Sequence, residues 1–123
     1  MKRLAIVFLI LTALPARAAE LVIVEADWCS WCRIWDKEIG VVYDQSPQAK
    51  LAPLRRIDIG DPLPDDLLFD SNPRVTPTFI LFKNNREIAR YEGYGGRQAF
   101  WDMLDGMLDQ IPMPRRKVSY IRY

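Results

Sequence analysis

A change in hydrophobic period near residue 30 constrains the fold more than any other feature of this sequence. Residues 21–26 form a short, β-branched apolar run, which is typical of a buried strand. From Ser30 onward the apolar positions instead follow one face of a helix, at Trp31, Ile34, Trp35, Ile39 and Val42. The sequence therefore predicts a strand that turns directly into a helix, with Cys29 and Cys32 at the junction.

The remaining pattern predicts one small α/β sheet domain. We expect strands at residues 53–59, 78–82 and 87–91, a short helix at 65–69 N-capped by Asp65, and a last helix at 101–111. The dipeptide Asn84-Asn85 suits a hairpin turn, because asparagine tolerates positive φ. A strand–helix–strand unit gives a parallel pair and the hairpin adds antiparallel strands. The expected fold is a mixed four-stranded sheet with helices on both faces.

The residue counts exclude several classes of chemistry. Half of the 123 residues are apolar and 27% are charged, which fits a single folded domain. The chain has two cysteines and no histidine, so it cannot run Ser-His or Cys-His catalysis or close a four-ligand zinc site. The net charge of +1 argues against nucleic-acid binding. We expect no metal, haem or nucleotide cofactor, which leaves cysteine chemistry as the main candidate.

The first 18 residues are typical of a secretory signal peptide. A basic start precedes the apolar run 4–14 and an Ala-Arg-Ala cleavage motif at residues 16–18. The run is too short to span a bilayer, and no cysteine lies at the cleavage site, so we expect no stable membrane anchor. Removing the peptide takes away three basic residues and changes the net charge to −2. The sequence predicts a periplasmic protein in an oxidising compartment.

The pair Cys29 and Cys32 admits three interpretations. Half of a metal site lacks partner ligands, and a structural bridge across so short a loop removes little entropy from the unfolded chain. A redox dithiol fits better, because the start of a helix stabilises a thiolate. We expect Cys29 to be exposed and to attack as a thiolate, with Cys32 one turn later as the resolving thiol.

These residues together resemble the thioredoxin family. The segment 27–32 is similar to its active-site segment, Thr76-Pro77-Thr78 to its cis-proline loop, and Gly93 to the glycine beside its site. The resemblance covers residues 21 to about 110. Residues 52–59, 62–64 and 92–94 further resemble the small periplasmic thioredoxins that accompany bacterial sulfur-oxidation enzymes. We therefore expect a reduced thioredoxin-like domain at residues 19–111, followed by a basic tail at 112–123.

The resemblance also implies residue roles. Cys29 becomes the nucleophile and Cys32 the resolving cysteine. An extended substrate segment would pair with the backbone of Thr76, which a cis peptide at Pro77 would expose. Trp28 and Gly93 would flank the substrate.

Two positions depart from the family or leave alternatives open. The buried aspartate that assists proton transfer in thioredoxins is replaced by Ile23. Glu25 is the nearest alternative proton acceptor, although we favour a solvent-facing or arginine-paired glutamate. Trp31 lies on the expected apolar face of the helix, so we favour core packing over substrate contact.

The resemblance implies a thiol–disulfide reductant that acts on a cysteine-containing periplasmic protein and is itself reduced by a membrane thiol–disulfide transporter. No histidine separates the cysteines, and Arg33 is expected to project away, so nothing strongly stabilises the Cys29 thiolate. A modest stabilisation favours a reductant over a strong oxidant. A disulfide oxidant, or a regulatory binding module with a non-catalytic cysteine pair, remains the alternative.

Overall fold

The computed structural model describes residues 19–111, and the expected signal peptide and basic tail lie outside the described residues. None of the helices within this range is long and apolar enough to cross a membrane. The elements in chain order are β1 (Ala19–Glu25), α1 (Ser30–Trp35), the π-helical segment η1 (Asp36–Gly40), α2 (Val41–Tyr43), α3 (Pro47–Leu51), β2 (Leu54–Asp58), β3 (Thr78–Lys83), β4 (Arg86–Glu92) and α4 (Arg97–Leu108).

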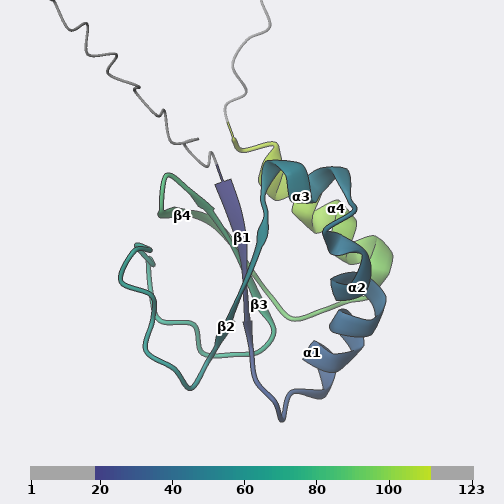
Figure 1. Cartoon of the computed structure of the whole chain (residues 1–123), viewed down its shortest axis with the longest axis horizontal. Coiled ribbons are helices and arrows are strands. Elements are labelled where there is room, and N and C mark those ends of the chain that lie inside the picture. The colour runs from purple at the N-terminus through teal and green to yellow at the C-terminus, as the bar shows by residue number, and fades with distance from the viewer. Residues whose placement is uncertain (1–18, 112–123) are drawn as a thin grey trace, which may run out of the picture.

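The strands form one mixed sheet in the order β2-β1-β3-β4 (Figure 1). β1 pairs with β2 in parallel, while β1–β3 and β3–β4 are antiparallel. This confirms the expected parallel pair and terminal hairpin. Asn84 and Asn85 make the hairpin turn with φ of 50° and 63°, as their tolerance of positive φ predicts.

All the helices pack on one face of the sheet, to the right of the strands in Figure 1. Alternate residues of β1, Leu21 and Ile23, face this layer, as do Phe79 and Leu81 of β3. The helices supply the other half of this core, through Trp35, Ile39, Tyr43, Phe100, Leu104 and Met107. The main core of the domain therefore lies between the sheet and the helices.

The opposite face is covered by the long connection at residues 59–77, so the expectation of helices on both faces is wrong. Val22, Val24, Ile80 and Phe82 face this connection, and Leu67 and Phe69 pack on them. The expected helix at 65–69 is also absent from the described chain. Leu67 is buried whereas Leu68 is exposed and forms a β-bridge with Arg86, an alternation of period two that suits an extended segment.

The helical stretch from Ser30 to Tyr43 is not uniform. Its buried residues are Cys32, Trp35, Ile39 and Tyr43, whereas Trp31, Ile34 and Val42 remain exposed, contrary to the expected apolar face. The wider π-helical turn between Asp36 and Gly40 changes which positions face the sheet. The structure also adds α3, because Ser46 accepts a hydrogen bond from the Ala49 N–H (3.1 Å) and Pro47 occupies the first helical turn.

Candidate active site

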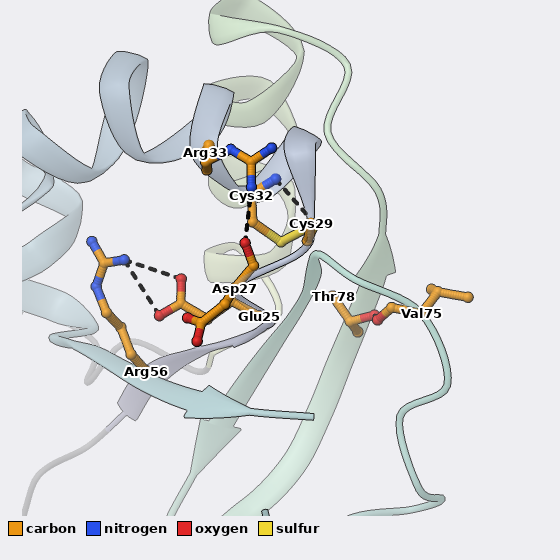
Figure 2. Close-up of a disulfide and its surroundings, with 8 residues drawn as sticks. All are labelled: Glu25, Asp27, Cys29, Cys32, Arg33, Arg56, Val75 and Thr78. Atoms are coloured by element: carbon orange, nitrogen blue, oxygen red, sulfur yellow. Dashed lines mark hydrogen bonds and ion pairs between the residues drawn. A yellow bond between two sulfur atoms is a disulfide. The ribbon is translucent and has the colours of Figure 1, made fainter. Parts of the chain in front are cut away.

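The predicted site residues gather at one end of the sheet. Val24 of β1 is opposite Thr78, and Thr78 is opposite Glu92 of β4. The chain after β1, the chain before β3 and the chain after β4 therefore leave the sheet at the same end. This register brings the cysteines, the Thr76–Pro77 turn and Gly93 to one end of the sheet. Figure 2 shows Cys29 and Cys32 near Val75 and Thr78, the residues on either side of that turn.

Cys29 and Cys32 form a disulfide, with their Cα atoms 5.3 Å apart. Cys29 is the N-cap of α1, and its Sγ accepts a hydrogen bond from the Cys32 N–H at 3.1 Å. Each cysteine is only 4% exposed, because Ala26 and Ile59 pack against the pair. The expectation that Cys29 is exposed is wrong for this disulfide-bonded form.

Two tryptophans that neighbour the cysteines in sequence, Trp28 and Trp31, are both exposed. Trp28 is 74% exposed, which fits the substrate-flanking place that the resemblance implies. Trp31 is 57% exposed, so our expectation that it packs in the core is wrong. The helix turns Cys32 and Trp35 toward the sheet, and Trp31 is left facing solvent.

The Thr76–Pro77 peptide bond is cis. The turn is held at its end by two hydrogen bonds, from Gly93 N–H to the Pro77 carbonyl (2.7 Å) and from Thr78 Oγ1 to the Val75 carbonyl (2.7 Å). Gly93 has a φ of 91°, which favours glycine, and its Cβ side faces open space. The structure thus ties the predicted residues Pro77 and Gly93 together directly.

A cavity of about 360 Å³ opens behind Cys32. It is lined by charged groups, among them Glu25, Arg33, Asp36, Arg56 and Asp58. Glu25 and Cys32 therefore share one cavity. Glu25 is paired with an arginine, which is the arrangement that the sequence favours.

Arg56 joins the two carboxylates of this cavity. Its guanidinium lies 3.1 Å from Glu25 Oε2 and 2.5 Å from Asp36 Oδ1, and 5.4 Å from the centre of the Trp35 ring. Burial lowers the pKa of Arg56, but the hydrogen bond with Asp36 and the charges of Glu25 and Asp36 outweigh it and raise that pKa. The close approach needs Gly40, because a Cβ there would clash with Asp36 Oδ1.

Arg33 does not project away from the cysteines as expected, because it lines the same cavity as Cys32. Its Nη1 donates to the Asp27 carbonyl at 2.8 Å and so ties the start of α1 to the turn that precedes Cys29 (Figure 2). No local pattern signals this contact, since it depends on a side chain folding back across six residues. Arg56 was missed for a similar reason, because its partners come from β1 and η1.

The chain is similar to solved thioredoxin structures. The periplasmic thioredoxin SoxS from Paracoccus pantotrophus shares 36% sequence identity with a TM-score of 0.73, over 75% of this chain and 97% of that chain. A mutant thioredoxin from Halobacterium salinarum NRC-1 shares 20% identity (TM-score 0.53; 77% and 79% covered). Trxlp from Edwardsiella tarda EIB202 shares 24% identity (TM-score 0.53; 72% and 86% covered). No protein-family model and no curated protein sequence matches the chain.

The two weaker likenesses support the fold alone, whereas the likeness to SoxS extends to the sequence over nearly the whole of that chain. The fold and the Cys29–Cys32 pair together support a thiol–disulfide oxidoreductase. The resemblance drawn from residues 27–32 and 76–78 is confirmed, and the chain belongs to the thioredoxin family.

Proposed function

We propose that the protein is a periplasmic reductase that transfers two electrons from its Cys29/Cys32 dithiol to a disulfide, or mixed disulfide, on a cysteine-containing partner. The observation that carries the proposal is the hydrogen bond from the Cys32 N–H to Cys29 Sγ. In the reduced form the same N–H can stabilise a thiolate at Cys29.

The reaction has two balanced steps. The Cys29 thiolate attacks one sulfur of the partner disulfide, which forms a mixed disulfide and releases the first partner thiolate. Cys32 loses its proton and attacks Cys29 Sγ, which forms the Cys29–Cys32 bond and releases the second thiolate. The partner gains two electrons, and the protein ends in the disulfide form that the structure contains.

The proton of Cys32 needs an acceptor, and Glu25 is the residue that we assign to this role. Glu25 lines the same cavity as Cys32, and Ile23 offers no titratable group on the same strand. Arg56 can remain paired with Asp36 while Glu25 takes up the proton. The variant Glu25→Gln should prolong the mixed disulfide without preventing its formation, whereas Asp58→Asn in the same cavity should not.

Residues 76–77 and the two exposed indoles supply the docking surface in this proposal. An extended partner segment would pair with the backbone at Thr76, with Trp28 and Gly93 on either side. The exposed Trp31 adds a second aromatic contact next to Cys32.

A trapping experiment tests the proposal. Cys32→Ser should accumulate mixed disulfides on Cys29 in a periplasmic extract, and the partner can be identified by mass spectrometry after release with dithiothreitol. Cys29→Ser is the matched control and should trap nothing. If Cys32→Ser forms no adducts, the binding-module alternative is favoured instead.

The direction of electron flow is tested by the midpoint potential of the Cys29–Cys32 couple. We expect a value nearer that of thioredoxin, about −270 mV, than that of strong oxidants, about −120 mV. A potential above about −150 mV would favour the disulfide-donor alternative.

The compartment and the pathway rest on similarity. The apolar run at residues 4–14 and the likeness to a periplasmic thioredoxin support export to the periplasm. A membrane thiol–disulfide transporter would then regenerate the dithiol, and a component of a sulfur-oxidation system is the partner that we expect to trap.

A further inference from the structure

A largely buried ion pair, between Glu87 and Arg90, lies on the loop-covered face of the sheet. Arg90 Nε contacts Glu87 Oε1 at 2.7 Å and Arg90 Nη2 contacts Glu87 Oε2 at 2.9 Å. The Glu87 side chain is 4% exposed and that of Arg90 is 17% exposed. Desolvating two charges is costly, so a pair in this position calls for an explanation.

A β-bulge places both side chains on the same face. Residues three apart in a regular strand point to opposite faces. The register shifts here, because Leu81 is opposite Ala89 whereas Phe82 is opposite Glu87, which leaves Ile88 without a partner. Glu87 therefore shares the face of Phe82, and Arg90 shares the face of its partner Ile80.

The pair also bonds to the backbone of the long connection. Glu87 Oε2 accepts from the Asp70 N–H at 2.9 Å, and Arg90 Nη2 donates to the Ser71 carbonyl at 2.7 Å. Two residues before Asp70, the Leu68 N–H donates to the Asn85 carbonyl at 2.8 Å, and the Leu68 carbonyl accepts from the Glu87 N–H at 3.0 Å. The ion pair thus fixes two consecutive residues of the connection through their backbone.

The same strand region fixes the other end of this segment. Gly93, directly after β4, donates to the Pro77 carbonyl. Residues 71–77 are therefore attached at their first residue to the ion pair of β4 and at their last residue to Gly93, which follows β4. The Val75 carbonyl also accepts from Thr78 Oγ1, within the turn itself. The intervening Asn72 and Arg74 are exposed, so the ion pair is the anchor on the N-terminal side of Thr76.

We propose that Glu87 and Arg90 are positioning residues that hold the Thr76–Pro77 turn in place for an extended partner segment. This inference rests on the proposed function, because it assumes that a partner pairs at Thr76. It differs from a role in stability alone, since it predicts a loss in recognition of polypeptides and none in the reactivity of Cys29 toward small disulfides.

The test compares two probes in a Cys32→Ser background, where Cys29 is the only thiol. One probe is an extended peptide whose single cysteine carries thionitrobenzoate, and the other is the small disulfide dithiobis(nitrobenzoate). Attack by Cys29 forms a mixed disulfide and releases coloured thionitrobenzoate from either probe. The measured quantity is the ratio of the two second-order rate constants, relative to the same ratio for free cysteine.

Two variants remove the anchor in different ways. The double variant Glu87→Leu with Arg90→Met replaces the buried pair with apolar side chains, which proteins often tolerate without loss of stability. Arg90→Lys keeps the charge but cannot bridge Glu87 and Ser71 with one planar fork. Arg55→Met is the matched control, because Arg55 bonds to Asp66 of the same connection, far from Thr76 in sequence.

We expect the double variant to lower the peptide rate about five- to tenfold, roughly the effect of losing one neutral hydrogen bond between the peptide and the turn, with the small-disulfide rate unchanged. Arg90→Lys should give a smaller decrease in the same ratio, and Arg55→Met none. An unchanged ratio in the double variant overturns the inference and leaves the proposed function standing, as does an equal fall in both rates.

The Cys32→Ser protein without further substitution separates the failure of the inference from the failure of the proposed function. If it reacts with neither probe, Cys29 is not the nucleophile and the proposed function fails. If its ratio of peptide rate to small-disulfide rate is no higher than that of free cysteine, it does not recognise the segment, and the inference is overturned while the chemistry of Cys29 stands.

Discussion

The two faces of the sheet are covered in different ways. Helices cover one face, and because a helix satisfies most of its own backbone hydrogen bonds, its core contacts with the sheet are mainly apolar. An irregular connection covers the other face and must find partners for its peptide groups, which Glu87 and Arg90 provide. The helix-covered face thus carries the Cys29 helix on a packed core, whereas the loop-covered face fixes the Thr76 turn through a few polar contacts.

The largest effect should come from the helix-covered face. Phe79 is fully buried on β3, with its ring centre 5.5 Å from that of Trp35 and 5.1 Å from that of Phe100. Phe79→Ala should lower the free energy of unfolding by about 4–5 kcal/mol, since a cavity between a sheet and helices collapses poorly. Urea denaturation followed by tryptophan fluorescence measures the change.

The matched substitution on the loop-covered face should cost less. Phe82 is equally buried on the same strand but faces Phe69 of the connection, at 4.9 Å between ring centres. Phe82→Ala should cost about 3 kcal/mol, because the connection can move inward and fill part of the cavity. An equal or greater loss than for Phe79→Ala, in the same urea series, would contradict the distinction between the faces.

A polar contact within the helix layer should have an intermediate effect. The buried Tyr43 hydroxyl donates to the Ala52 carbonyl at 2.7 Å, so Tyr43→Phe should cost about 1–2 kcal/mol at neutral pH. Burial, with a contribution from the charge of Asp44, raises the pKa of Tyr43.

The raised pKa gives this contact a pH dependence. The folded state holds the Tyr43 proton more tightly than the unfolded state, so the stabilisation is complete below about pH 10 and is lost as the pH rises above it. Urea midpoints between about pH 9 and pH 11 should therefore fall more steeply for the unsubstituted protein than for Tyr43→Phe. If the urea midpoints of the two proteins fall in parallel with pH, Tyr43 loses its proton equally readily in the folded and unfolded states, and the prediction is wrong.

The smallest effect should come from the exposed ion pair of the connection. Arg55 lies 2.8 Å from Asp66, and its hydrogen bond holds the pKa of Asp66 below the usual value. The pair can stabilise the fold only at a pH above the ordinary pKa of an aspartate, and this stabilisation is lost as the pH falls from that value through the lowered pKa of Asp66. Solvent screens the interaction, so the stabilisation is small. Asp66→Asn should leave the urea midpoint unchanged within error at pH 7, in low or high salt.

The sequence predicted the sheet well because its signals are local. Alternation, β-branched runs and the Asn84-Asn85 turn each act within a few residues, and they predicted all four strands, the parallel pair and the terminal hairpin. The antiparallel pairing of β1 with β3 was not predicted, because it joins strands far apart in the sequence. The site residues from Trp28 to Gly93 came mostly from a family resemblance. The register of β1, β3 and β4 then brought them to one end of the sheet.

The features that were missed depend on tertiary contacts. The π-helical turn between Asp36 and Gly40 shifted the buried face of the residues that follow it and left Val42 exposed, and no local pattern marks such a turn. The bulge at Ile88 arises from how β4 pairs, so Glu87 and Arg90 look like ordinary strand charges in the sequence. The prediction of a helix at residues 65–69 was wrong because Leu67 and Phe69 pack on the sheet from an extended segment.

The bridge between Leu68 and Arg86 also bears on self-association. A sheet with free edges can add strands from other molecules, and that is a route to aggregation. On the β4 edge, the Glu87 N–H that points away from the sheet donates to the Leu68 carbonyl. The opposite edge strand, β2, is short and carries the adjacent charges of Arg55 and Arg56. Because both edge strands are protected in this way, a concentrated solution should resist edge-to-edge fibril formation. An extended segment from another protein would then pair at the Thr76 turn and not at an edge strand.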